Sequence, residues 1–381
     1  MFYRPTSIVL FLLFLSASTS FHLWFQQSVS TNMVQANTLH HAETMKQTHS
    51  ATLLCSRASI LVPLLCRVHR LDVDSVQCNA LQQSALNACA ARNQNTPFQF
   101  SYALILTPPT PTTTTTNNHT TTIPTHLHQT WKTHEVHPVF QHYYQSWSKN
   151  HPSWTRQIWS DQDNRNLVEV KFPELLSFYD QLSHTILRVD VVRYLILYQH
   201  GGVYADMDIE SLQPMDALLK ENTKVLLGFE SYEPSFTIEI SLMGAIPKQP
   251  LWLKVIYEVI LAVADPNVTS IFNTTGNVLF TRVVKRELLL HSQEQEQQEQ
   301  QKHQQKQGNS GHHGIEIMPR EIFFPPYPLR YQTRNMQRCR CGPVAPYIGY
   351  PCHACLKMYP TSYTLHHETG TWVHSWGADG L

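Results

Sequence analysis

Residues 188–208 constrain the fold of this chain more than any other segment. Apolar residues recur at three- and four-residue steps from 189 to 197, which is the pattern of a buried helix face. Gly201-Gly202 follows, where a left-handed residue most easily ends a helix. A short β-type run, 203–205, then leads into Asp206-Met207-Asp208. The segment therefore predicts a helix, a tight stop and a strand that ends at a pair of acids.

These acids indicate a metal and phosphate site. Side chains alternate along extended chain, so the carboxylates of Asp206 and Asp208 are expected on one face. Two hard oxygen ligands at a strand end suit Mg²⁺ or Mn²⁺ with a phosphate attached. On the helix, Asp190 and Arg193 are three residues apart and therefore neighbours on one side. The alternatives are a solvated turn for the two acids and a plain helix salt bridge for Asp190 and Arg193.

Composition limits the classes of function. The 381 residues suffice for one large domain with appendages or for two domains. The formal net charge is zero at pH 7, and no basic stripe carries interleaved aromatic residues. A nucleic-acid partner is therefore not expected.

The N-terminus predicts entry into the secretory pathway. Arg4 precedes an apolar run at 8–15, and small polar residues follow, as in a signal peptide. Read through residue 25, the run is near the lower length limit for a spanning helix, which makes a signal anchor the alternative. An anchor gives a single-pass type II membrane protein, whereas cleavage gives a secreted or lumenal one. The sequons at Asn118, Asn267 and Asn273 agree weakly with a lumenal location.

Three further regions follow residues 1–25. Residues 26–107 form a poorly defined stem, for which one or two disulfides or a poorly ordered segment are expected. Residues 108–122 are a Pro/Thr-rich stalk, and 123–381 form a globular domain. The domain contains a Gln-rich insertion at 292–311, expected to be a disordered surface loop, and a Cys-rich insertion at 339–355. The Cys-rich insertion favours two disulfides over a zinc site.

Within residues 123–381, strands alternate with helices, which predicts an α/β sheet with a nucleotide site at the carboxyl ends of its strands. Strands are expected at 123–131, 157–159, 203–205, 224–230 and 241–247. Helices are expected before 150, from 172, around 188–200, at 251–264 and from 277 to about 290, with a turn at 161–164. His128 is expected to be structural.

Residues 123–219 and 363–376 resemble glycosyltransferase family 32, the sugar transferases with the DxD motif. Four motifs carry the resemblance: Ile-Pro-x-x-x-His128-Gln-x-Trp131, Arg188-x-Asp190-x-x-Arg193-Tyr194, Gly201-Gly202-x-Tyr204-x-Asp206-x-Asp208, and a terminal His366-His367 with Ser375-Trp376. The chain departs from the family at Asn277, where proline is frequent, and in its Cys-rich insertion.

The resemblance implies a GT-A fold, which is a Rossmann-like domain for a nucleotide sugar, with retention of anomeric configuration and Mn²⁺ or Mg²⁺ as cofactor. It implies that Asp206 contacts the donor and Asp208 the metal, and that Asp190 and Arg193 hold the donor sugar. The remaining implied contacts are Trp131 on the base, Tyr204 in the donor site, His366 (or His367) on the metal, and Ser375 and Trp376 over the phosphates. An aromatic face stacks on a base for about 1–3 kcal/mol, whichever base it is.

The sequence thus predicts a Golgi-membrane hexosyltransferase. GDP-mannose is the favoured donor, with UDP-sugars open, and the acceptor is a glycan or a glycolipid such as an inositol-phosphoceramide. A catalytically silent lumenal binding protein and a metal-dependent phosphohydrolase are the competing hypotheses.

Overall fold

The computed structural model describes residues 57–68, 78–79, 82–83, 122–231, 237–302, 314–325, 360–367 and 369. The predicted N-terminal anchor, nearly all of the stalk, the Cys-rich insertion and the Ser375-Trp376 pair lie outside these residues. The sheets, their helices and the candidate site all lie in the larger of two compact units, made of residues 59–82 and 105–381. Of the helices in the described ranges, none combines the length and the apolar character needed to cross a membrane.

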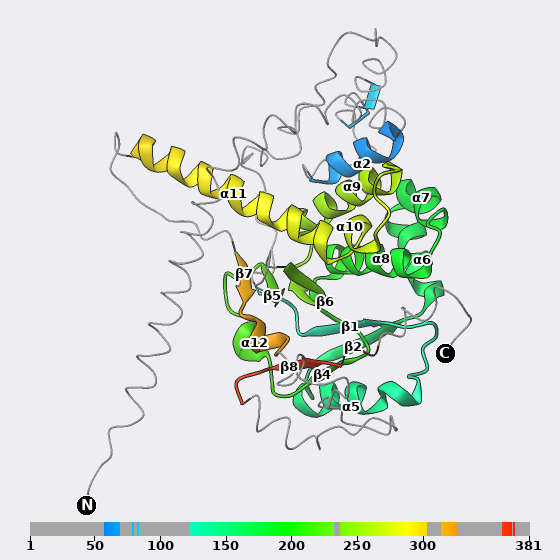
Figure 1. The fold of residues 1–381 in the computed structure, drawn as a ribbon, viewed down its shortest axis with the longest axis vertical. Coiled ribbons are helices and arrows are strands. Elements are labelled where there is room, and N and C mark those ends of the chain that lie inside the picture. Colours follow the sequence, from blue (N-terminus) through cyan, green and yellow to red (C-terminus); the bar gives the residue numbers. More distant parts are fainter. Residues whose placement is uncertain are drawn as a thin grey trace, which may run out of the picture. The chain divides into compact units, whose positions relative to one another are not determined.

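A six-stranded mixed sheet forms the centre of this unit, which confirms the α/β class (Figure 1). In spatial order its strands are β2 (Thr155–Trp159), β1 (His126–Thr130), β3 (Gly202–Ala205), β6 (Thr237–Ala245), β5 (Val225–Ser231) and β7 (Ile315–Met318). Strand β1 is parallel to β2 and β3, so these three end at the same edge. Strand β6 is antiparallel to both neighbours. The strands expected at 157–159, 203–205, 224–230 and 241–247 are all present.

Helices cover the sheet on both faces (Figure 1). One side carries α6 (Asp161–Lys171), α7 (Leu176–Asp180), α8 (Thr185–His200), α9 (Pro250–Ala264), α10 (Ile271–Thr274) and α11 (Asn277–Lys302). The other side carries α5 (Gln141–Asn150), α12 (Arg320–Phe323) and a two-stranded sheet of β4 (Ile209–Ser211) and β8 (Thr364–His366).

Aromatic side chains join the helices on the first side. The rings of Tyr194 in α8 and Phe280 in α11 stack with centroids 5.6 Å apart, and Trp252 in α9 stacks 6.1 Å from Tyr194. All three side chains are fully buried. This aromatic packing fixes α8, and with it the Asp190–Arg193 pair, relative to the sheet.

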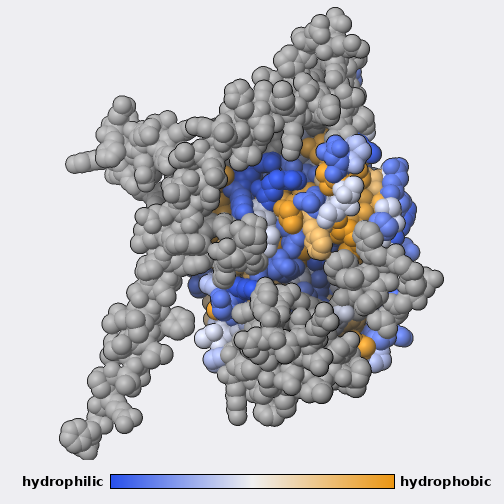
Figure 2. All heavy atoms as spheres, viewed as in Figure 1, coloured by the Kyte–Doolittle hydropathy of each residue, from blue (hydrophilic) through white to orange (hydrophobic). Residues whose placement is uncertain are grey.

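The face seen in Figure 2 carries hydrophilic residues beside a smaller hydrophobic area.

The Gly201-Gly202 link sets the path from α8 into β3. Both residues have positive φ, +65° and +87°, as the sequence predicted for the end of this helix. A Cβ on Gly202 would lie 2.5 Å from the carbonyl oxygen of His126. The link therefore requires glycine both for its backbone conformation and for the close approach of β3 to β1.

Two local predictions were wrong. Residues 161–164 begin helix α6 instead of forming a turn, because Ser160 and Asp163 make a reciprocal capping box. The Gln-rich segment was expected to be disordered, yet residues 292–302 continue helix α11. Gln, Glu and Lys are good helix formers, and no Gly or Pro interrupts the segment there. Residues 303–311 lie outside the described part.

Part of the predicted stem packs as a helix, α2 (Ala58–Val68). Cys66 is bonded to Cys78, so one of the expected stem disulfides is present. Arg67 Nε donates to Glu174 Oε1 at 2.7 Å, and the guanidinium lies 5.2 Å above the ring of Phe172. The apolar face of α2 is buried. Residues 59–68 of this helix are therefore part of the larger packed unit.

Candidate active site

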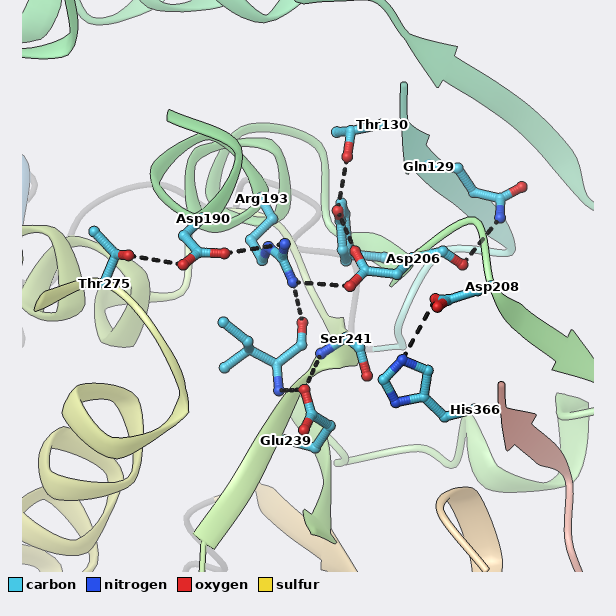
Figure 3. A network of polar contacts seen from close by, with 12 residues as sticks. Gln129, Thr130, Asp190, Arg193, Asp206, Asp208, Glu239, Ser241, Thr275 and His366 are labelled. Carbon is cyan, nitrogen blue, oxygen red and sulfur yellow. Dashed lines mark hydrogen bonds and ion pairs between the residues drawn. The ribbon is translucent and has the colours of Figure 1, made fainter. Parts of the chain in front are cut away.

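Asp206 and Asp208 lie at the carboxyl edge of the parallel strands, immediately after β3. The expectation of extended backbone here was wrong: the chain turns, with Ile209 N donating to Asp206 O at 3.0 Å. The turn is needed because β3 and β4 belong to different sheets. Figure 3 shows that both side chains nevertheless face the same region.

Asp206 is held by two neighbours. The Tyr204 hydroxyl donates to its Oδ1 at 2.7 Å, and Arg193 Nη1 lies 3.4 Å from its Oδ2. The Tyr204 hydroxyl also pairs with Thr130 Oγ1, and the Tyr204 ring lies below the Arg193 guanidinium. Burial raises the pKa of Asp206 although Arg193 opposes this. Tyr204 itself is fully buried, so it reaches the site only through Asp206.

The ion pair between Asp190 and Arg193 on α8 forms as predicted. Arg193 Nη2 lies 3.0 Å from Asp190 Oδ1, and Thr275 Oγ1 donates to Asp190 Oδ2 at 2.7 Å. Arg193 Nη1 also donates to the carbonyl oxygen of Ile240 at 3.0 Å. Burial lowers the pKa of Arg193, but the charges of Asp206, Tyr204 and Asp190 outweigh it and raise that pKa above its ordinary value. Arg193 is thus a buried cation that joins α8, β6 and the turn after β3.

Asp208 is bound by the C-terminal segment. Thr369 donates to its Oδ2 from both the backbone N, at 2.9 Å, and Oγ1, at 2.8 Å. His366 Nε2 lies 3.4 Å from its Oδ1. Burial raises the pKa of Asp208, but His366 and Thr369 outweigh it and hold that pKa well below its usual range. Burial lowers the pKa of His366, but Asp208 outweighs it and raises that pKa to about 10.

Asp208 and the neutral form of His366 could together hold a divalent cation, which requires the imidazole to release its proton as the metal binds. Two atoms in adjacent octahedral positions around Mg²⁺ lie about 3 Å apart, given bonds of about 2.1 Å. The separation of 3.4 Å between Asp208 Oδ1 and His366 Nε2 is close to that. Within the described ranges, no cluster of three or more His, Cys, Asp or Glu side chains suits a metal ion. Mg²⁺ commonly takes its other ligands from water and substrate phosphates, so two protein ligands are compatible with it.

Trp131 follows β1 at the same edge. Its ring packs edge-on against Phe140 at 4.9 Å, in a cluster that includes Met207 from between the two acids. The side chain is only partly buried, so part of it remains open to a ligand.

His128 has a structural position, as expected. Trp159 Nε1 donates to His128 Nδ1 at 3.1 Å, which leaves the proton on Nε2 to donate to Gly201 O at 3.0 Å. The residue is fully buried, and that burial, with His126, lowers its pKa to about 3. The neutral ring therefore ties β1 to β2 and to the end of α8.

Three residues of the site were missed from the sequence: Thr369, Glu210 and Glu239. His367, the alternative metal ligand, contacts Glu210, whereas His366 contacts Asp208. Glu210 Oε2 pairs with His367 Nε2 at 2.8 Å, and His367 stacks on Tyr143. These contacts fix the pairing of β4 with β8 beneath Asp208. Glu239 lies on β6, where burial and Glu230 raise its pKa to about 7. No motif singled out these three residues, whereas the repeated acids, the i,i+3 pair and the terminal His-His pair each carried a signal in the sequence.

Residues 138–225 match the protein family described as glycosyltransferase sugar-binding region containing DXD motif. The matched range includes α8, the two glycines and both acids, and it confirms the resemblance to DxD-containing sugar transferases.

Several yeast mannosyltransferases are homologous to part of this chain. The chain is 37% identical over 100 residues to Inositol phosphoceramide mannosyltransferase 3 of Schizosaccharomyces pombe, covering 26% of this chain and 28% of that protein. It is 32% identical over 148 residues to Inositol phosphoceramide mannosyltransferase 2 of the same yeast, covering 39% and 40%. It is 30% identical over 110 residues to Initiation-specific alpha-1,6-mannosyltransferase of Candida albicans, covering 27% and 29%. The matches thus span less than half of these relatives.

Proposed function

We propose that this chain is a metal-dependent glycosyltransferase with a GT-A fold that moves a hexose from a nucleotide sugar to a hydroxyl acceptor, with retention of anomeric configuration. The observation that carries the proposal is the meeting of Asp206, Asp208, Arg193 and His366 at the carboxyl edge of parallel strands. Nucleotide ligands bind at this edge in open α/β sheets. The match of residues 138–225 to a sugar-binding DXD region gives independent support.

In this proposal, Asp208 and the neutral form of His366 would hold Mn²⁺ or Mg²⁺, which would supply positive charge against the nucleotide diphosphate. Asp206 accepts hydrogen bonds from hydroxyl groups of the donor. Trp131 offers an aromatic face to the base. Ser375 and Trp376, outside the described residues, close over the phosphates.

Asp190 and Tyr204 act on the donor through their neighbours. Both are buried, and their polar atoms pair with Arg193, Thr275, Asp206 and Thr130. Arg193 in turn holds one oxygen of Asp206, which leaves that carboxylate oriented before the donor arrives. Such preorganisation lowers the reorganisation cost of catalysis.

GDP-mannose is the first donor to test, because the similar yeast proteins are named mannosyltransferases. Their names point to two acceptor classes: an inositol-phosphoceramide and a glycan that takes an α-1,6-linked mannose. We propose the glycolipid first, with a Golgi-membrane location through the N-terminal segment.

The test begins with thermal shifts of the purified chain with GDP, UDP and CDP, each with and without Mn²⁺, since a ligand stabilises the folded state that binds it. Hexose transfer or donor hydrolysis is then assayed with nucleotide sugars that contain the nucleotide giving the largest thermal shift. NMR of the product identifies its anomeric configuration. Asp208→Asn is expected to abolish the Mn²⁺-dependent shift and the activity. Asp180→Asn, in a surface ion pair with Arg165, is the matched control and is expected to keep both.

Three outcomes would contradict the proposal. Nucleotide stabilisation without transfer or hydrolysis from any GDP- or UDP-sugar favours a silent binding protein. Phosphate release that needs no sugar donor favours a phosphohydrolase. A product with inverted configuration at the anomeric carbon removes the retaining mechanism.

A further inference from the structure

Strand β6 carries an irregularity beside the acid pair. On its β5 side, Leu226 pairs with Gly244 and Gly228 pairs with Glu239, so β6 contributes more residues than β5 between these two points. Such bulges re-aim side chains and occur often next to active sites. Here the irregular stretch includes Ser241, whose carbonyl oxygen accepts a hydrogen bond from Asp206 N at 2.8 Å. The bulge of β6 is thus joined directly to the turn that carries the acids.

Glu239 holds this bulge with one carboxylate oxygen. Its Oε1 accepts hydrogen bonds from Ile240 N at 2.9 Å and from Ser241 N at 3.0 Å. The carbonyl oxygen of Ile240, in the same stretch, accepts a hydrogen bond from Arg193 Nη1. Among the residues that the structure describes, the second oxygen, Oε2, accepts no hydrogen bond, and the side chain is only partly buried. One oxygen of Glu239 is therefore engaged in the fold and the other is available to a ligand.

Two buried polar atoms near the acid pair, one of them next to Glu239, have no hydrogen-bond partner within the described residues. Ser241 is 1% exposed, and its Oγ has no hydrogen-bond partner within the described part of the chain. Gln129 is also 1% exposed, and its Oε1 is likewise unpaired there, although its Nε2 donates to Asp206 O at 3.4 Å. In Figure 3, Ser241 lies between Glu239 and the Asp208–His366 pair. A buried hydroxyl left without a partner is destabilising, so Ser241 Oγ next to the open carboxylate of Glu239 points to a polar ligand.

We propose that Glu239 binds substrate: its Oε2 accepts a hydrogen bond from a sugar hydroxyl, with Ser241 Oγ as a neighbouring partner. This inference rests on the proposed glycosyltransferase function. The ligand chemistry is a hydroxyl group because Glu239, ionised above its pKa of about 7, supplies a charged acceptor, and Ser241 supplies a group that both donates and accepts. The hydroxyl has two sources, the donor hexose or the acceptor.

Glu239→Gln separates substrate binding from support of the bulge. The amide oxygen of Gln can accept the two backbone N–H groups, so the melting temperature is expected to stay near that of the wild type. The other atom becomes an NH₂ group, which donates where the carboxylate accepted. A hydrogen bond to a charged group contributes about 1.5–3 kcal/mol, which corresponds to a loss of about 10- to 150-fold. Glu239→Ala, which loses both functions, is expected to melt at a lower temperature.

Two measurements identify the source of the hydroxyl. The first is the ratio of the Kd for the nucleotide sugar to the Kd for the nucleoside diphosphate, by calorimetry with Mn²⁺. The ratio does not depend on the folded fraction, so it stays informative if the variant is destabilised. A ratio raised about tenfold or more in Glu239→Gln places the contact on the donor hexose. If the ratio is unchanged, transfer to the acceptor falls about tenfold or more and donor hydrolysis is retained, the contact of Glu239 is with the acceptor.

An unchanged ratio together with unchanged transfer would show that Glu239 serves the bulge alone, and would overturn the inference while leaving the proposed function intact. Wild-type protein that binds no nucleotide sugar would instead overturn the proposed function, and this inference with it.

Discussion

His366 Nε2 lies 3.4 Å from Asp208 Oδ1, although the two residues are far apart in the sequence. Strand pairing brings them together, since Ile209 of β4, the residue after Asp208, is the register partner of His366 in β8. Glu210 and His367 form a second contact across the same strand pair. The C-terminal segment is therefore needed to complete the site that the DxD segment begins.

Thr369 holds the carboxylate of Asp208, so its loss is expected to weaken metal binding. Thr369→Val removes the Oγ1 donor at 2.8 Å but keeps the backbone donor. Removing a group that orients a metal ligand typically costs 10- to 100-fold in affinity, and a loss of about tenfold is expected here. The measurement is a Mn²⁺ titration with GDP present. Thr133→Val, at an exposed position, is the matched control. Equal affinities for all three proteins would mean that Thr369 does not orient Asp208.

Arg193 neutralises two carboxylates, so its removal is expected to destabilise the fold. In Arg193→Met, the buried Asp190 keeps its hydrogen bond from Thr275 but loses its cation, and Asp206 also loses its cation. Removing one member of a buried ion pair costs about 3–5 kcal/mol. The free energy of unfolding from urea titration checks this. Arg165→Met removes an arginine that also pairs with two carboxylates, but at the surface, so a much smaller loss is expected. Equal losses for both variants would contradict the role assigned to Arg193.

The sequence predicted those parts of the site that depend on local geometry. The three-residue spacing of Asp190 and Arg193 predicted their contact, because helix geometry places such residues side by side. Five of the six strands of the central sheet, all except β7, and the glycine stop after α8 were likewise readable from local pattern. Each of these features depends on a few consecutive residues, and tertiary packing agrees with the local preference.

The parts that depend on topology were not predicted. Glu239 reaches the site only because β6 is irregular, and Thr369 only because β8 pairs with β4. The turn at Asp206 follows from the change of sheet after β3, which no local pattern encodes. The start of α6 is different, because Ser160 and Asp163 have capping-box spacing and could have been recognised.

Gly202 is expected to be intolerant of a side chain. Its φ is +87°, and a Cβ would lie 2.5 Å from the carbonyl oxygen of His126, so Gly202→Ala must displace β1 or β3. We expect a loss of stability of at least about 1–3 kcal/mol from the strained backbone, in addition to the clash. Gly244→Ala is the control, since its Cβ would meet nothing closer than 3.4 Å. Thermal melts of both variants check this, and equal melting temperatures would show that the link can relax.

His128 is expected to make stability depend on pH. Its pKa in the folded protein is about 3, below the ordinary 6.5, because burial disfavours the charged ring. Between these values the unfolded chain binds a proton that the folded chain does not, so the free energy of unfolding falls as pH falls below 6.5, by up to about 1.4 kcal/mol per unit. From pH 7 to pH 5 the loss from this residue is then about 2 kcal/mol. Urea titrations across this range should give a shallower slope for His128→Gln, because its side chain does not titrate, whereas His184→Asn, at an exposed position, should keep the wild-type slope. A slope unchanged in His128→Gln would mean that other groups cause the pH dependence.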